Sequence, residues 1–390
     1  MNKNLFVLLI SQVFSFTAAP VTVFLSGIIG SQISPIKSLS TLPISISIIG
    51  IAIGSIIASK LMSLIGRKNG FIIASIGNSI FSILAAYSIF IQNFFLFCFA
   101  NFFIGIGMAF THQYRFAAAE SVDKSIAPKA ISILLFGGII SAFLGPSLAN
   151  YTKDLISENL YVGSYLSLAF LTFIPSILFL FYESKSKIET SLEYVGRGYL
   201  ELLSQPKFLQ ALIASAFGYA IMTFLMTATP ISMHVMENFS LSKTSFVIQF
   251  HVASMFLPSL ITGHLIKKFG HSNIIYVGLV FYSITIIASF FEQTFFNYMF
   301  ALIFLGIGWN FLFISGTSLL TLTSLPLKTK RLEKRCPYLI EDGVINLGKF
   351  SIEHKIWKVK DDNIKDHLGR LFDYCVCREE FKKSMGVNSN

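Results

Sequence analysis

The sequence predicts an all-α integral membrane protein with ten spanning helices in two related halves, the second of them incomplete. Hydrophobic residues make up 54% of the 390 residues and charged residues 13%, which is about half the charged share of a soluble domain. The mean hydropathy is +0.68. Apolar stretches of about 18 residues or more recur along the chain, and each can cross a hydrocarbon core of about 30 Å as a helix. The stretches are continuous and do not alternate with polar residues, so they predict helices.

We expect the first stretch, residues 5–29, to be a spanning helix and not a cleaved leader, because it exceeds the roughly 7–15-residue core of a signal peptide and further spans follow it. The ten predicted spans cover residues 5–29, 41–65, 71–92, 94–116, 128–150, 160–182, 208–233, 244–266, 273–291 and 295–322.

Basic residues concentrate in the connections on one side of the predicted bundle. Thirteen Lys and Arg lie on the side of the N-terminus, and the connections on the other side hold only Lys37, Lys153 and Lys243. By the positive-inside rule, the N-terminus is expected in the cytoplasm, in a plasma membrane of the bacterial inner-membrane type. The net charge of +10 then reflects orientation in the lipid bilayer, and we expect no nucleic-acid partner.

The two halves share three landmarks in the same order, 200 to 210 residues apart. These are Thr17-Ala18-Ala19-Pro20 and Thr227-Ala228-Thr229-Pro230, Gly66-Arg67-Lys68 and Lys267-Lys268-Phe269-Gly270, and Ile104-Gly105-Ile106-Gly107 and Leu305-Gly306-Ile307-Gly308. They predict a duplication, with a six-helix repeat at residues 1–182, a cytoplasmic linker at 183–207, a four-helix repeat at 208–325 and a charged cytoplasmic tail at 326–390.

The tail begins where the repeat requires an eleventh span, near residue 328. Residues 328–390 hold 14 Lys and Arg and 10 Asp and Glu, and no stretch is apolar enough to span. We expect that a change of reading frame has removed the last two helices. The alternative is a genuine cytoplasmic appendage, in which Cys336, Cys375 and Cys377 have a composition typical of metal binding.

Several motifs resemble those of the major facilitator superfamily over residues 1–325. Residues 59–68 match the end of its motif between helices 2 and 3, with Gly66, Arg67 and Lys68 as the gating residues, although Ser63 and Leu64 replace its acidic residue and first arginine. Asn101 stands where many proton-coupled members have arginine, and Gly145-Pro146 is similar to the core of the antiporter motif. The resemblance implies two parallel six-helix repeats that carry a small solute by alternating access, with the solute bound near the membrane midplane.

Soft side chains form one further pattern, in which Met222 and Met226 lie four residues apart in span 7, and His251 and Met255 lie four apart in span 8. Residues four apart share a helix face, so antiparallel neighbouring helices would bring the four side chains together at two depths. Thioethers and imidazole suit Cu(I). The alternative is that the methionines fill the core and His251 is a hydrogen-bonded polar residue.

This second pattern resembles the CcoA-type copper importers of the same superfamily. That resemblance implies copper uptake for cytochrome c oxidase assembly, with copper as a transported substrate and not as a cofactor. Two other functions stay open: an exporter of a small organic compound, suggested by Gly145-Pro146, and a degenerate membrane protein without transport, suggested by the missing spans.

Weaker candidates for metal contact are Met233, His234 and Met236 at the outer end of span 7, and Met108 with His112 near the inner end of span 4. Cys98 is expected to be a packed core thiol. The sequence has no phosphate-binding loop and no arrangement of catalytic residues, so neither an ATP-driven pump nor an enzyme is expected.

Overall fold

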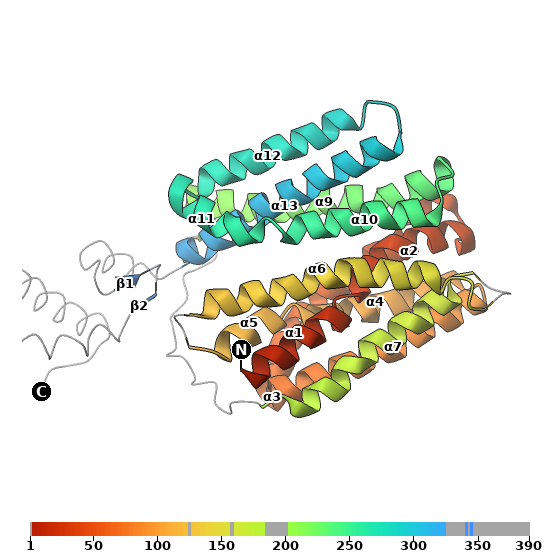
Figure 1. Cartoon of the computed structure of the whole chain (residues 1–390), viewed down its shortest axis with the longest axis horizontal. Coiled ribbons are helices and arrows are strands. Elements are labelled where there is room, and N and C mark those ends of the chain that lie inside the picture. Colours follow the sequence, from red (N-terminus) through yellow and green to blue (C-terminus); the bar gives the residue numbers. More distant parts are fainter. Residues whose placement is uncertain are drawn as a thin grey trace, which may run out of the picture. The chain divides into compact units, whose positions relative to one another are not determined.

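The computed structural model describes residues 2–123, 126–156, 160–183 and 202–324, together with 340–341 and 344–345 (Figure 1). The elements of the first half are α1 (Lys3–Ser15), α2 (Ala18–Ile33), η1 (Lys37–Leu39), α3 (Leu42–Phe90), α4 (Phe94–Thr111), α5 (Tyr114–Glu120), α6 (Ala127–Tyr151), α7 (Val162–Leu178) and η3 (Phe179–Phe181). Those that follow are α9 (Pro206–Pro230), the π-helix η4 (Ile231–Met236), α10 (Leu241–Phe256), α11 (Ser259–Phe269), α12 (His271–Ala288), α13 (Phe295–Ser324), β1 (Ile340–Glu341) and β2 (Val344–Ile345).

The chain divides into two compact units. The larger unit consists of Met1–Glu189 and Ala214–Ser315, and contains most of the apolar helices. The second unit consists of Thr190–Ile213 and Gly316–Asn390. Its described parts are the first turns of α9, the last turns of α13 and a hairpin in which β1 pairs with β2 antiparallel, Ile340 opposite Ile345.

Eight helices of the described chain are long and apolar enough to cross a membrane, or nine if α10 and α11, which meet at a 40° bend, form one span. The 49 residues of α3 would extend about 74 Å, more than twice a hydrocarbon core of about 30 Å. Gly66 interrupts α3 with non-helical angles, φ 82° and ψ 160°. Divided there, α3 supplies two spans, and the described residues hold the ten spans that the sequence predicts.

The same glycine turn occurs in both halves. Gly270 has φ 84° and ψ 157°, almost the conformation of Gly66, and lies between α11 and α12. A positive φ of this kind is strained for any residue with a Cβ, which explains why glycine occupies both positions. The prolines of the first landmark also correspond, because Pro20 follows the break between α1 and α2, and Pro230 ends α9 at the start of the π-helix.

The glycine pairs of α4 and α13 pack in matching ways. A Cβ at Gly105 would overlap the carbonyl oxygen of Ser47, and a Cβ at Gly306 would lie 2.8 Å from the carbonyl oxygen of His251. His251 follows Ser47 by 204 residues, so the two contacts correspond in the repeat. The second glycine of each pair, Gly107 or Gly308, packs against the next span. Each half therefore brings its fourth helix close to its second and third by the same device, as expected for small residues between membrane helices.

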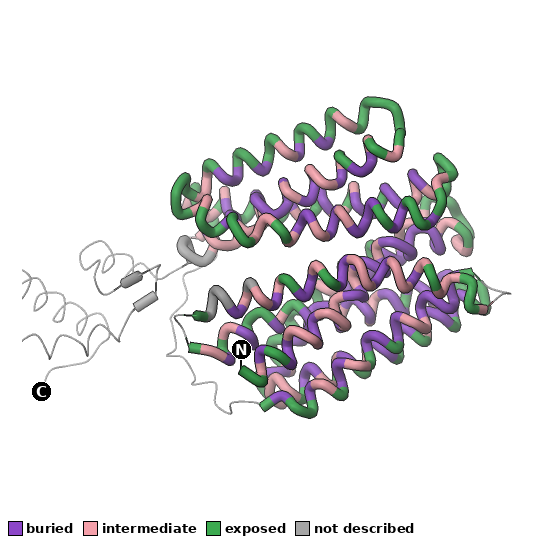
Figure 2. Tube along the Cα trace, viewed as in Figure 1, coloured by how far each residue is buried: buried purple, intermediate pink, exposed green. Residues whose placement is uncertain are grey.

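Large apolar side chains on the outer faces of the helices are exposed. Ile56 is 72% exposed, Phe170 67% and Phe224 73%, and exposed positions follow the outward faces of many helices in Figure 2. In water such a surface would be costly, whereas in a bilayer it is the surface that contacts lipid tails. The fold is therefore that of a multi-pass membrane protein.

Candidate functional site

The predicted gating residues Gly66, Arg67 and Lys68 lie together at the turn inside α3. Arg67 donates two hydrogen bonds to the Glu120 carboxylate, from Nε at 2.7 Å and from Nη2 at 2.5 Å. This is the bidentate arrangement that makes arginine–carboxylate pairs strong and directional. Lys68 Nζ donates to the Leu180 carbonyl oxygen at 2.6 Å. The motif thus joins α3 to the end of α5 and to η3.

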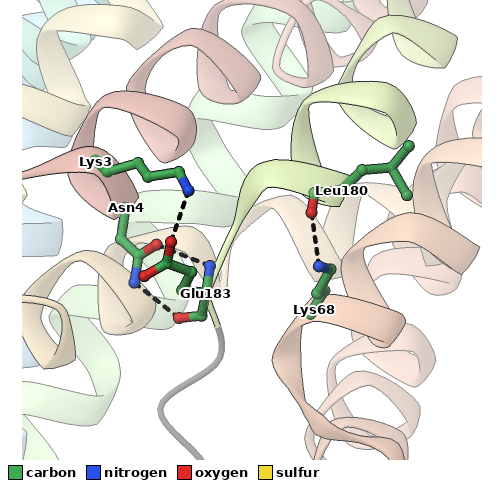
Figure 3. Close-up of polar contacts among 5 residues, drawn as sticks. All are labelled: Lys3, Asn4, Lys68, Leu180 and Glu183. Carbon is green, nitrogen blue, oxygen red and sulfur yellow. Dashed lines mark hydrogen bonds and ion pairs between the residues drawn. The ribbon is translucent and has the colours of Figure 1, made fainter.

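A second set of polar contacts joins the start of α1 to Glu183, the second residue after η3 (Figure 3). Lys3 Nζ lies 2.6 Å from Glu183 Oε1, and the Asn4 side chain exchanges two hydrogen bonds with the Glu183 backbone. The hydrogen bond from Lys3, and then its charge, hold the pKa of the Glu183 carboxyl below its usual range. Both side chains are exposed, so this ion pair positions the chain end and adds little stability.

We expect charge reversal at Arg67 to test the role of its ion pair. Arg67→Glu places two carboxylates against each other, and transport should fall at least about tenfold, the equivalent of about 1.4 kcal/mol. Adding Glu120→Arg restores the pair with reversed signs and should recover most of the activity. Uptake per folded molecule is the measurement. If the double variant is no better than Arg67→Glu alone, the pair does not carry the effect.

The first half contains a buried polar network around Asn101. Ser26 Oγ donates to Asn101 Oδ1 at 3.1 Å and lies 2.9 Å from the Tyr165 hydroxyl, and Asn101 Nδ2 donates to the Phe97 carbonyl oxygen. All three polar side chains are fully buried. Asn101 therefore links α2, α4 and α7 through neutral groups. It occupies the position at which the motif described above often has an arginine.

The two halves of the larger unit meet through neutral side chains. Gln249 Nε2 on α10 donates to Ser147 Oγ on α6 at 2.9 Å. On the neighbouring helices, a Cβ at Gly27 of α2 would lie 3.0 Å from the Ile231 side chain of η4. These contacts are one neutral hydrogen bond and close apolar packing.

The four predicted soft ligands are all buried, with exposed fractions of 4% for Met222, 5% for Met226, 0% for His251 and 8% for Met255. His251 Nδ1 lies 2.7 Å from the Leu302 carbonyl oxygen on α13. Its Nε2 has no hydrogen-bond partner among the described residues. His251 is thus fixed by one nitrogen and has the other available.

The α9 pair also lies on a face that is directed toward α13. Met222 and Met226 follow Tyr219 by three and seven residues, and Tyr219 contacts the Trp309 ring on α13. Residues at this spacing share a helix face. No group of three His, Cys, Asp or Glu side chains in the described chain is arranged to hold a metal ion, so a metal site there has to use methionine sulfur. The convergence of all four ligands stays a prediction.

The weaker candidates at the outer end of span 7 differ in their surroundings. Met233 is fully buried and Met236 is 69% exposed, while His234 Nδ1 is held by the Phe239 carbonyl oxygen at 2.8 Å. Cys98 is a buried free thiol, as predicted. The tail and its cysteines lie outside the described residues, apart from β1 and β2.

An aromatic group that the sequence did not single out lies on α9 and α13. Trp309 stacks on Phe313 with ring centroids 4.8 Å apart and an interplanar angle of 10°, and Tyr219 lies 6.2 Å from Trp309. The buried indole Nε1 of Trp309 has no hydrogen-bond partner among the described residues. Tyr219 and Trp309 are near the middle of their spans, so the group lies at mid-depth. The local signal for this group in the sequence is that Trp309 directly follows the Gly306 and Gly308 landmark.

A second aromatic group joins the two halves. The Phe16 ring lies 6.4 Å from the His112 ring and 5.3 Å from the Phe256 ring, edge to face in both cases. Met108, one turn before His112, is buried, whereas His112 is exposed. Met108 and His112 therefore have different surroundings, and metal contact by the pair stays a prediction.

A sequence profile of the Major Facilitator Superfamily matches residues 5–329. The chain belongs to the major facilitator superfamily. This superfamily consists of secondary transporters, so the glycine turns, the two repeated halves and the aromatic groups are parts of a solute carrier. Membership confirms the predicted fold and the expectation of a membrane transporter.

Two curated relatives align over most of this superfamily member. The riboflavin transporter RfnT of Brucella anthropi is 35% identical over 322 residues, which cover 82% of this chain and 81% of the relative. The uncharacterized MFS-type transporter YdeG of Bacillus subtilis is 28% identical over 339 residues, 82% of this chain and 78% of the relative.

Solved structures of a bacterial homolog to the human lysosomal transporter Spinster share the fold at 14% identity. The inward-facing, occupied form has a TM-score of 0.58, and the inward-facing, unoccupied form has a TM-score of 0.60. Each alignment covers 98% of this chain and 92% of that chain. At this identity the likeness concerns the fold alone.

Proposed function

We propose that this protein takes up a neutral, planar heteroaromatic solute of the flavin class across a bacterial inner membrane. The observation that carries the proposal is the mid-depth aromatic group of Tyr219, Trp309 and Phe313 with its unpartnered indole N–H. It is supported by the similarity to a riboflavin transporter over four-fifths of the chain. Aromatic rings offer stacking surfaces to a flat ring system, and a buried N–H without a partner favours a ligand with a carbonyl oxygen.

The charge of the membrane interior fits a neutral solute. In the described spans, Glu120 is the sole acidic residue, and it lies at the last position of its span and binds Arg67. A cationic solute would need a negative charge to offset its desolvation in the membrane. An isoalloxazine ring is neutral near pH 7. Its flat face suits the stacking rings, and the carbonyl oxygens and ring nitrogens along one edge can accept a hydrogen bond from the indole N–H.

The experiment is uptake of labelled riboflavin by cells that lack their own uptake system and express this chain. Accumulation above that of cells with an empty vector supports the proposal and gives the direction of transport. Faster loss of riboflavin from preloaded cells would instead support the exporter alternative. A well-expressed protein that moves riboflavin in neither direction contradicts the flavin assignment, and a chain inert toward every solute would be the degenerate protein.

Copper uptake is the second candidate, and one observation favours it. Among the described residues, His251 is fully buried with Nε2 unpartnered, and three buried methionines lie on α9 and α10. A neutral imidazole and thioethers are ligands that suit Cu(I). We propose this role only for Met222, Met226, His251 and Met255.

Two leucine substitutions separate the candidates. His251→Leu and Met222→Leu remove an imidazole and a thioether donor. The near-isosteric Met222→Leu costs less than about 1.5 kcal/mol when the residue is core filler, whereas His251→Leu also loses the hydrogen bond to the Leu302 carbonyl oxygen. If copper is the substrate, copper accumulation should fall to the level of the empty vector with membrane abundance unchanged. Full copper accumulation by the double variant would exclude copper, and riboflavin uptake in the same cells is the control.

A further inference from the structure

Three helix breaks meet at the second aromatic group. Phe16 lies between α1 and α2, His112 is the C-cap of α4 before α5 begins, and Phe256 is the last residue of α10 before its bend into α11. Phe16 touches both other rings. His112 and Phe16 belong to the first half and Phe256 to the second, so a change at His112 can reach the other half through one intervening ring.

His112 is also exceptional among the histidines of the described spans, which are His112, His234, His251, His264 and His271. His251 is fully buried and bound to the Leu302 carbonyl oxygen. His264 is exposed on α11. His112 alone of these histidines is both exposed and in contact with a ring that bridges the halves.

We propose that His112 binds and releases one proton in each transport cycle, and that the contact of Phe16 with Phe256 transmits its charge to the second half. This inference rests on the transport function proposed above. Histidine is the side chain whose charge ordinarily changes between about pH 5 and 8. The imidazole takes a proton from water on one side of the membrane and gives the same proton to water on the other.

A physical link from charge to conformation follows from the ring contacts. The His112 and Phe16 rings are 6.4 Å apart, close to the roughly 6 Å within which a cation is attracted to an aromatic face. A protonated imidazole would therefore draw Phe16 toward it and away from Phe256. The other charged groups near His112 are Arg115, one turn later and placed over the Phe116 ring, and Glu120, which Arg67 binds. Phe16 and Phe256 have no titratable residue within two positions along the chain.

The test uses the full chain in proteoliposomes, with riboflavin as the probe. An imposed pH gradient, acidic outside, should drive riboflavin accumulation by the wild-type protein. His112→Gln should reduce this accumulation at least about tenfold and leave the exchange of labelled for unlabelled riboflavin within about twofold, because exchange needs no net proton movement. His264→Gln, the matched control, should leave both processes unchanged. His112→Glu, which restores a titratable group, should recover part of the accumulation.

The outcomes separate this inference from the proposed substrate. Wild-type exchange without any response to the pH gradient, or accumulation by His112→Gln at the wild-type level, overturns the role of His112 and leaves the flavin assignment intact. Absence of wild-type exchange rejects riboflavin instead. In that case nitrogen NMR of labelled histidines tests whether His112 binds a proton. The His112 signal is identified as the one that is lost in His112→Gln, and it must change between about pH 4 and 8. A constant signal overturns the proposal. A His112→Gln protein that does not fold is replaced by His112→Asn.

Discussion

Replacement of Gly105 by alanine is expected to prevent stable folding of the protein in the membrane. A Cβ at this position would overlap the carbonyl oxygen of Ser47, a backbone atom that cannot rotate away. Overpacking typically costs about 1 to 3 kcal/mol and occasionally more, and we expect the upper end of this range because the obstacle is backbone. We expect a sharp loss of folded protein, measured by the monodisperse fraction after detergent extraction and by the temperature at which it unfolds.

Two further alanine substitutions control for this effect. Gly77→Ala places the same methyl group where nothing lies within 4 Å, so its stability should be unchanged or slightly raised, as for alanine in an unobstructed helix. Gly306→Ala meets the Ser254 hydroxyl, which can rotate, and the His251 carbonyl oxygen at 2.8 Å. Its cost should lie between the other two. An unfolding temperature for Gly105→Ala equal to that for Gly77→Ala would show that α3 and α4 are not packed as described.

Loss of the Trp309 ring is expected to have the largest effect on transport itself. Trp309→Leu removes the stacking surface that lies against Phe313 and near Tyr219, and uptake efficiency for riboflavin, kcat/KM, should fall at least about tenfold. Trp309→Phe keeps a ring but removes the N–H. If that N–H donates to the solute, KM should rise about fivefold to tenfold, which corresponds to about 1 to 1.4 kcal/mol for one hydrogen bond.

Phe311→Leu is the matched control for the ring. Phe311 lies two residues further along α13, is as buried as Trp309 and packs against Phe281 on α12. Its replacement should lower stability and leave KM within about twofold. If Phe311→Leu raises KM as much as Trp309→Leu does, the effect arises from packing of α13 and not from contact with the solute.

Most of the fold could be predicted because long apolar stretches and glycine turns have strong local signals. Residues 41–65 and 71–92 were expected as separate spans, and the turn at Gly66 separates them although helical hydrogen bonding continues around it. The breaks inside spans are different. Thr111-His112-Gln113 contains neither glycine nor proline, so the end of α4 there depends on packing with neighbouring helices, which a single sequence does not specify.

The site was less predictable for a related reason. The chain has 41 phenylalanines and 14 tyrosines, and composition does not distinguish a ring that faces lipid from one that faces another ring. Trp309, Phe313 and Tyr219 become a group only when α9 and α13 are placed together. The Met and His spacing correctly selected buried residues, whereas burial alone agrees with core filler as well as with a ligand.

The single-residue turn at Gly66 also determines how this part of the chain enters the membrane during synthesis. Since one residue separates the two helical stretches of α3, neither can be released into lipid with a free loop behind it, and the two must leave the translocation machinery as a preformed hairpin. Arg67 and Lys68 directly after the turn keep its tip on the basic side. Tags or reporters inserted at this turn should therefore stop assembly of the hairpin, whereas the opposite turn at residues 91–93, which lies outside the helices, is the better place for them.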